Sequence, residues 1–304
     1  EKAIRELRQG KAFIVWDGEG CNDSDGTMSY VLFGYNGGSD PKGCYITSSR
    51  LSTHECLVFI WEEYQNLKDY IHTSFGFGFD VDQILRDIPT ETLQILKETN
   101  DITWEGWRIK YIPRKFFSVS RGRGKGITIY DTISFFYGNL IQVAKQYIPD
   151  NPIIEPVAKG KSQRDSFDYS ELESKIIPYW RLEGKLMISV MNALRKSLVG
   201  AGINLTSWHG PGAVAEALLK RERIATHIQE SRIEMPLEVL EATSYAYFGG
   251  RFECNIIGYI PGPVYSYDIR SAYPAALSNT PMLYGGKWVP TNSVTQWGIY
   301  YVSN

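Results

Sequence analysis

The sequence lacks the cysteine patterns and the long apolar runs that identify several protein classes. It contains four cysteines, and none of them forms a CxxC pair. It therefore predicts neither a zinc site nor a disulfide framework, and a reduced, intracellular protein is expected. No apolar run approaches the roughly 20 residues that a membrane-spanning helix needs, so we expect no membrane partner.

An excess of positive charge is also lacking. The 304 residues carry a net charge of −2, which argues against a simple DNA-coating protein but not against an enzyme with a local basic channel. No internal repeat or low-complexity tract is present. The chain is instead 43% hydrophobic and 13% aromatic, which indicates a packed globular core, and its length suits one large domain or two ordinary ones.

A short apolar run ends in two acidic residues in the stretch Phe13-Ile-Val-Trp-Asp-Gly-Glu-Gly20. Because alternate residues of an extended strand share a face, Asp17 and Glu19 are expected to project together. Two adjacent carboxylates repel each other and cost desolvation energy unless a cation lies between them. Mg²⁺ suits hard oxygen ligands and is commonly held by one or two carboxylates. The pair is interpreted either as a metal site or, more simply, as a strand running into a polar turn.

Two later stretches add acidic side chains. Ser74-Phe-Gly-Phe-Gly-Phe-Asp80 alternates aromatic residues with glycine and predicts a buried strand that ends at Asp80. Taken alone, Asp80 is more typical of a helix N-cap. Pro178 suits the first position of a long helix, whose apolar stripe consists of Leu182, Leu186, Val190, Leu194 and Leu198. On this helix Tyr179 and Glu183 lie four residues apart and share a face. Taken alone, this pair is an ordinary helix face.

The remaining pattern is of the α/β class, with strands and helices in alternation. Further strands are predicted over residues 28–34, 43–47, 102–112, 115–120, 127–131, 250–257 and 263–268, and further helices over 52–67 and 210–230. Residues 150–166, rich in Pro, Lys and Gly, predict an exposed loop. The basic turn Ser120–Gly126 is either a solvated hairpin tip or a contact to a phosphate backbone.

Four carboxylates and a phenol thus come from separate elements: Asp17, Glu19, Asp80, Glu183 and Tyr179. Such a set is what a two-metal phosphodiesterase needs, because two cations can hold the scissile phosphate, generate hydroxide and stabilise the leaving oxygen. The tyrosine hydroxyl would orient the attacking water.

The order Asp-x-Glu, Phe-Asp and Tyr-x-x-x-acid resembles the three motifs of proofreading 3′–5′ exonucleases of the DEDDy type, which have an RNase H-like fold. Tyr247-Phe-Gly-Gly250 resembles the Tyr-x-Gly-Gly element that joins exonuclease and polymerase regions in protein-primed family B DNA polymerases. Tyr267-Asp-Ile-Arg-Ser-Ala-Tyr-Pro274 resembles polymerase motif A. Over about residues 13 to 280, the chain is similar to the N-terminal part of a viral or mobile-element family B DNA polymerase.

This resemblance implies a role for each matching residue. The exonuclease acids Asp17, Glu19, Asp80 and Glu183 would hold two Mg²⁺ or Mn²⁺ ions, and Tyr179 would position the water. Tyr247, Gly249 and Gly250 would guide the DNA strand between the two active sites. Asp268 would be one of two polymerase metal ligands, and Tyr273 would stack beneath the sugar of the incoming nucleotide, where its ring excludes a 2′-hydroxyl.

Three departures from the family pattern are visible. The third exonuclease motif usually ends in Asp, and here it ends in Glu183. The second motif usually carries an Asn shortly before its aspartate, and here Phe77 and Gly78 stand in that region. Neither a Lys-rich motif B helix nor an Asp-Thr-Asp motif C follows motif A before Asn304. Part of the palm, the core of the fingers and the thumb would therefore lie outside this chain.

The expected organisation is an α/β RNase H-like exonuclease domain with a mixed sheet and flanking helices at residues 1–200, a connecting helical segment at 201–245, and the start of the polymerase palm at 246–304. Single-stranded DNA and primer-template DNA are the implied partners, and dNTP only together with the missing palm and fingers. A terminal protein and the remaining polymerase segments are further candidates. If the source is viral, the expected location is the host cytoplasm.

Two other functions stay open at this point. The first is a self-standing or split protein whose only chemistry is 3′–5′ degradation. The second is an RNase H-like module with an inactive site that binds single-stranded DNA or a replication partner. Nuclease activity with Mg²⁺ on a labelled oligonucleotide separates the inactive module from the other two.

Overall fold

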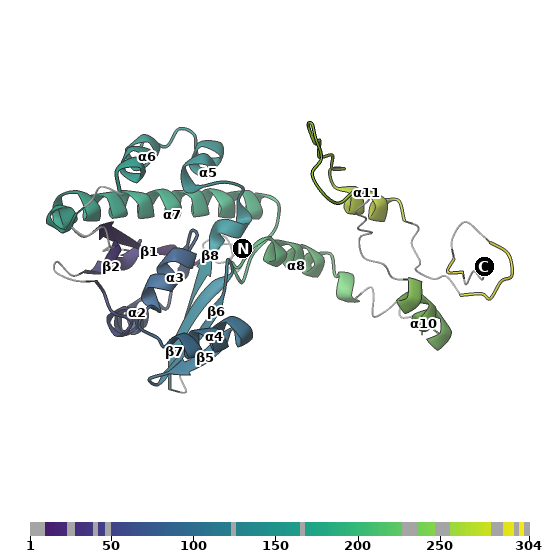
Figure 1. The fold of residues 1–304 in the computed structure, drawn as a ribbon, viewed down its shortest axis with the longest axis horizontal. Coiled ribbons are helices and arrows are strands. Elements are labelled where there is room, and N and C mark those ends of the chain that lie inside the picture. Colours follow the sequence, from purple (N-terminus) through teal and green to yellow (C-terminus); the bar gives the residue numbers. More distant parts are fainter. Residues whose placement is uncertain are drawn as a thin grey trace, which may run out of the picture. The chain divides into compact units, whose positions relative to one another are not determined.

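The computed structural model describes residues 10–22, 28–38, 42–45, 50–122, 126–164, 168–226, 236–246, 256–280, 288–294 and 298–300. The chain divides into two units, Glu1–Arg221 and Glu222–Asn304. Figure 1 traces both units in the colours of the sequence.

A single mixed sheet forms the frame of the first unit. Its eight strands lie in the order β3-β2-β1-β4-β8-β7-β6-β5. The strands are β1 (Phe13–Asn22), β2 (Met28–Asn36), β3 (Lys42–Tyr45), β4 (Ile71–Ser74), β5 (Asp101–Trp104), β6 (Trp107–Ile112), β7 (Phe116–Arg121) and β8 (Ile127–Asp131). β4 pairs in parallel with both β1 and β8, and the other neighbours are antiparallel. The predicted α/β class with a mixed sheet is confirmed, and the arrangement is consistent with an RNase H-like fold.

Strand β1 separates two hydrophobic cores. Ile14 and Trp16 point into one core, which also contains buried residues of α2 (Thr53–Leu67) and α3 (Gly78–Ile84). Phe13 and Val15 point into the other core on the opposite face. This is the alternation of an extended strand that is buried on both sides.

Helices cover both faces of the sheet. Ser52 and Glu55 form a capping box at the start of α2, and α4 (Thr90–Thr99) packs beside β5. On the other face lie α5 (Leu140–Tyr147), α6 (Ile154–Gln163) and the long α7 (Ile177–Gly200). Figure 1 shows α7 running across the sheet with α5 and α6 against its outer side. α7 has the predicted apolar stripe, with Leu186, Val190 and Leu194 buried.

The exposed loop predicted for residues 150–166 is wrong for most of its length, because α6 occupies Ile154–Gln163. Pro156 lies in the first turn of α6, where the missing N–H removes no hydrogen bond within the helix. Gly160 meets α7: a Cβ at this position would lie 2.2 Å from Cδ2 of Tyr179. The proline and the glycine that favoured a loop therefore occupy positions that a helix tolerates.

The predicted strand ending at Asp80 is also wrong. β4 ends at Ser74, and Asp80 lies in the first turn of α3, whose N-cap residue is Phe77. Gly76 has a φ of +77°, a left-handed conformation that glycine adopts without steric cost and that ends the strand. The residues between Ser74 and Asp80 therefore form a turn and the start of a short helix, and not a strand.

The first unit also contains α8 (Pro211–Arg221), together with the short turns η1 (Thr132–Phe135), η3 (Tyr169–Glu171) and η4 (Leu172–Ile176). In the second unit, the described residues form the helices α10 (Leu237–Ala246) and α11 (Ala272–Ser278), neither of which has a buried residue. The strand predicted at 263–268 is wrong, because these residues are described and are not in a strand. Most of the strand predicted at 250–257 lies outside the described residues. Within the described part of the chain, no helix has the length and hydrophobicity to cross a membrane.

Candidate metal-binding site

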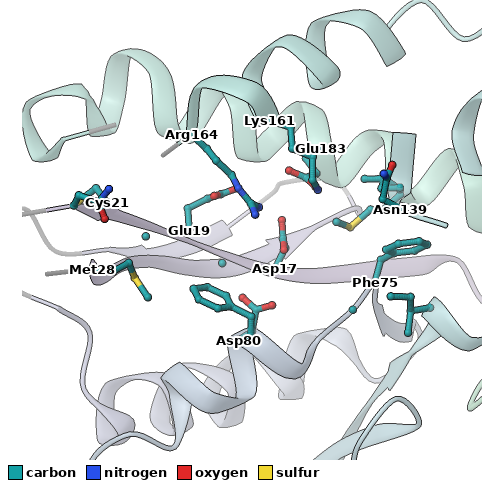
Figure 2. A pocket seen from close by; sticks show the side chains of 18 residues that line it. Asp17, Glu19, Cys21, Met28, Phe75, Asp80, Asn139, Lys161, Arg164 and Glu183 are labelled. Carbon is teal, nitrogen blue, oxygen red and sulfur yellow. The ribbon is translucent and has the colours of Figure 1, made fainter. Parts of the chain in front are cut away.

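A pocket of about 390 Å³ opens where β1, α3, α6 and α7 meet. Four of the predicted acidic residues line it: Asp17 and Glu19 from β1, Asp80 from α3 and Glu183 from α7. Figure 2 shows these side chains around the pocket, with Asp17 drawn between Asp80 on one side and Glu183 on the other. The pocket thus brings together acids that are far apart in the sequence.

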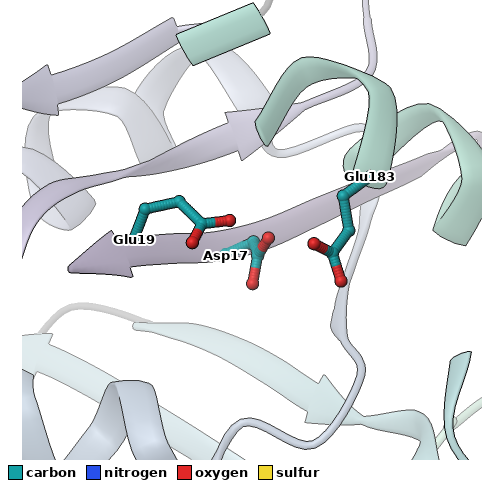
Figure 3. A group of neighbouring side chains, drawn as sticks. All are labelled: Asp17, Glu19 and Glu183. Carbon is teal, nitrogen blue, oxygen red and sulfur yellow. The ribbon is translucent and has the colours of Figure 1, made fainter. Parts of the chain in front are cut away.

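Three of the carboxylates form a tight group. Asp17, Glu19 and Glu183 each offer an oxygen, and these oxygens all lie within 4.8 Å of one another. Figure 3 shows the three carboxylates converging from β1 and α7. Oδ2 of Asp17 is buried and has no hydrogen-bond partner, which is costly for a carboxylate oxygen unless a cation contacts it.

Asp80 lies across the pocket from this group and is held by its own partners. The hydroxyl of Tyr30 in β2 donates a hydrogen bond of 2.8 Å to Oδ1 of Asp80. The turn before α3 is fixed by the buried Asp131 of β8, which accepts hydrogen bonds from the backbone N–H groups of Gly76 (2.8 Å) and Phe77 (3.1 Å). Both supporting residues are absent from the sequence motifs.

Burial and mutual repulsion destabilise the charged form of the pocket carboxylates. Burial, followed by the charges of Glu183 and its neighbours, raises the pKa of Asp17 well above its ordinary value. The same two causes raise the pKa of Glu19. Burial also raises the pKa of Asp80 to about 7, although the hydrogen bond from Tyr30 opposes this shift. A cation in the pocket would relieve each of these effects.

The donor set fits a divalent cation. It consists of hard carboxylate oxygens, which suit Mg²⁺ and Mn²⁺ and not soft metals. Asp17, a member of this set, also has a buried oxygen without a hydrogen-bond partner. Asp17, Glu19 and Glu183 are therefore the residues that could hold a metal, with Asp80 on the opposite wall of the pocket.

Helix α7 places its polar groups against β1. The indole N–H of Trp180 donates to the backbone oxygen of Asp17 over 3.1 Å, and the hydroxyl of Tyr179 donates to Oε2 of Glu183. Burial and the charge of Glu183 raise the pKa of Tyr179 above its ordinary value, so the phenol stays a proton donor. The predicted partnership of Tyr179 and Glu183 on one helix face is thus present.

Two cations were missed by the sequence reasoning, Lys161 in α6 and Arg164 at the C-cap of this helix. Nζ of Lys161 lies 2.8 Å from Oε1 of Glu183, and Arg164 lines the same pocket and acts electrostatically on Glu19. The available signal was weak: the apolar residues Ile154 and Val157 are three apart, as are Lys161 and Arg164, which is the spacing of a helix. The Pro, Gly and Lys residues of this segment favoured a loop over the helix that this spacing indicates.

The predicted polymerase-side residues belong to the second unit. Tyr247, Gly249 and Gly250 lie outside the described residues. Asp268 and Tyr273 are described, and both side chains are exposed in the second unit. The roles predicted for these five residues therefore stay predictions.

Comparison with protein families gives one match. Residues 222–301 match the family model described as DNA polymerase type B, organellar and viral. The matched segment contains all five predicted polymerase-side residues and none of the pocket residues. For this segment, the resemblance to family B DNA polymerases is confirmed. No curated protein and no solved structure matches the chain.

Proposed function

We propose that this chain is the N-terminal part of a family B DNA polymerase, and that its first unit is a 3′–5′ exonuclease. The exonuclease would hydrolyse the 3′-terminal phosphodiester of single-stranded DNA. The observation that carries the proposal is the group of buried carboxylates Asp17, Glu19 and Glu183, which offer oxygens within 4.8 Å of one another.

Two Mg²⁺ or Mn²⁺ ions held by the four acids would supply the nucleophilic hydroxide and stabilise the leaving oxygen. The side chains of the protein would hold these ions and orient the attacking water. Asp17 and Glu183 belong to the tight group, and Asp80 faces them from α3. Tyr179, which is buried and protonated, would orient the attacking water through its hydroxyl group.

The walls of the pocket suit a DNA end. Lys161 and Arg164 place positive charge beside the acids, where a phosphate of the substrate would lie. The ring of Phe79 lines the pocket and is 49% exposed, so that an unpaired base could stack on it. Stacking on an aromatic ring tolerates any base, and we expect little sequence preference.

The part of the second unit from residue 246 onward would belong to the polymerase palm. In this proposal Asp268 is a ligand of the polymerase metals and Tyr273 lies beneath the sugar of the incoming nucleotide. Tyr247, Gly249 and Gly250 guide the strand between the two sites. The domain limits 1–200, 201–245 and 246–304, and a terminal protein or further polymerase segments as partners, are part of the same proposal.

The test is digestion of a 5′-labelled oligonucleotide in the presence of Mg²⁺. The chain should shorten a single strand stepwise from its 3′ end, and faster than it shortens a blunt duplex. Asp17→Ala/Glu19→Ala should lose this activity, because the metal ligands of β1 are removed.

Glu91→Ala/Glu98→Ala is the matched control, since it removes the same charge from exposed positions of α4. It should digest DNA as the wild type does. Wild-type activity in the Asp17→Ala/Glu19→Ala variant, or a preference for internal cuts in duplex DNA, would refute the assignment.

A further inference from the structure

Tyr30 is a fully buried tyrosine whose hydroxyl reaches an acid of the pocket. Its side chain is 1% exposed. It comes from β2, the antiparallel neighbour of β1, and donates to Oδ1 of Asp80 on α3. One side chain therefore connects a second strand with the helix that carries the fourth acid.

The ring of Tyr30 reaches Asp80 by passing over Gly18. A Cβ at Gly18 would lie 1.9 Å from the hydroxyl oxygen of Tyr30 and 2.3 Å from its Cζ. Real atoms do not approach so closely, so any larger residue at this position would displace the ring. Gly18 stands between Asp17 and Glu19, and its lack of a side chain opens the path.

We propose that Tyr30 is a positioning residue of the metal site and that Gly18 is the residue that admits it. By donating to Oδ1 of Asp80, the Tyr30 hydroxyl fixes the orientation of the carboxylate in the wall of the pocket. Partners of this kind orient metal ligands and commonly matter for metal affinity nearly as much as the ligands. The inference rests on the proposed two-metal function of the pocket.

Strand β2 contains its own control for this role. The hydroxyl of Tyr35 donates to Oε2 of Glu63 over 3.2 Å, and Tyr35 is also buried. The two tyrosines thus make the same kind of bond from the same strand, but Glu63 on α2 is not among the residues that line the pocket. Loss of either hydroxyl should destabilise the fold, and only loss of the Tyr30 hydroxyl should affect the metal.

The experiment measures Mn²⁺ binding by electron paramagnetic resonance, without DNA, in the wild type and in Tyr30→Phe and Tyr35→Phe. Tyr30→Phe should bind Mn²⁺ about tenfold more weakly than the wild type. Tyr35→Phe should keep wild-type affinity while its melting temperature falls. Unchanged Mn²⁺ affinity in Tyr30→Phe would overturn the role of Tyr30 and leave the exonuclease assignment standing.

A wild-type chain that neither binds Mn²⁺ nor digests DNA would overturn both proposals. The path over Gly18 has a separate test in a double-mutant cycle with Tyr30→Leu, which removes the ring. Gly18→Ala should lower the melting temperature strongly in the wild type and much less beside Tyr30→Leu. Equal effects in the two backgrounds would refute the contact between Gly18 and Tyr30.

Discussion

Gly184 offers a sharp test of how α7 presents Glu183 to the pocket. A Cβ at Gly184 would lie 2.3 Å from Cγ and Nδ2 of Asn36, and 2.5 Å from its Cβ. Asn36 is fully buried in β2, and its amide lies 3.4 Å from the backbone oxygen of Trp180. Because the obstructing atoms include the Cβ of Asn36, rotation of its amide cannot relieve the overlap. Gly184→Ala should therefore push α7 away from the sheet.

The magnitude follows from two opposing effects. Alanine is favoured over glycine inside a helix by about 1 kcal/mol, whereas overpacking a tight core costs about 1–3 kcal/mol. With an overlap this severe, we expect a net loss of about 1–2 kcal/mol, or a fall in melting temperature of about 2–8 °C for a unit of this size. A shift of Glu183 by up to ~1 Å should reduce exonuclease activity by at least about tenfold.

Gly200→Ala is the matched control on the same helix. Gly200 is the last residue of α7, and a Cβ there would meet no atom within 4 Å. This variant should be neutral or stabilised by up to ~1 kcal/mol and should keep wild-type activity. The assays are thermal unfolding without metal and oligonucleotide digestion with Mg²⁺ well below the melting temperature. If Gly184→Ala were as stable and as active as Gly200→Ala, the packing of α7 on β2 would be refuted.

Three further predictions concern charge, pH and polymerisation. In the absence of metal, Asp17→Ala/Glu19→Ala should be at least as stable as the wild type in thermal unfolding, because repulsion between buried carboxylates is relieved. A clear loss of stability would contradict this repulsion. His72 is buried and has its pKa lowered to about 4, mainly by burial, while Nδ1 accepts a hydrogen bond from the Trp16 indole. Above pH 6.5 both the folded and the unfolded state hold it neutral. As pH falls from 6.5 to 4, His72 gains a proton only in the unfolded state, so its contribution to stability should fall by up to about 3 kcal/mol. Between these pH values, the change in the free energy of urea unfolding should be less unfavourable in His72→Gln than in the wild type, and an equal change would contradict the prediction. Finally, the purified 304-residue chain should not extend a primer, because its sequence contains no Asp or Glu after Asp268 and two metals need more than one carboxylate. Template-dependent incorporation of dNTP would show this to be wrong.

Local patterns were sufficient to predict the elements that carry three of the four acids. The alternation of Phe13 to Glu19 predicted a strand, and the stripe of α7 together with Pro178 predicted a long helix; both are present. These patterns succeed because a strand repeats every two residues and a helix every 3.6, so that a buried face is visible within a few residues. The shared faces of Asp17 with Glu19 and of Tyr179 with Glu183 follow from the same periodicities.

Local patterns failed where long-range packing decides the conformation. Residues 154–163 form α6 because Ile154 and Val157 pack into the core that α6 shares with α5 and α7. Gly160 also allows the helix to approach Tyr179 closely. The turn before Asp80 depends on Asp131, which is more than fifty positions later in the sequence. In the first segment proline and glycine predicted a loop, and in the second the alternation of aromatic residues with glycine predicted a strand. Tertiary contacts overrode both local preferences.

The sequence by itself determined the acidic residue types, their pairing on single strands and helices, and the family resemblance that residues 222–301 confirm. The tertiary structure alone decided that Asp17, Glu19 and Glu183 meet within 4.8 Å, that Lys161 neutralises part of their charge, and that Tyr30 crosses Gly18 to hold Asp80. The physical reason is the range of the interactions. Periodicity and capping act over a few residues, whereas the convergence of charges in one pocket depends on which faces of distant elements are buried against each other.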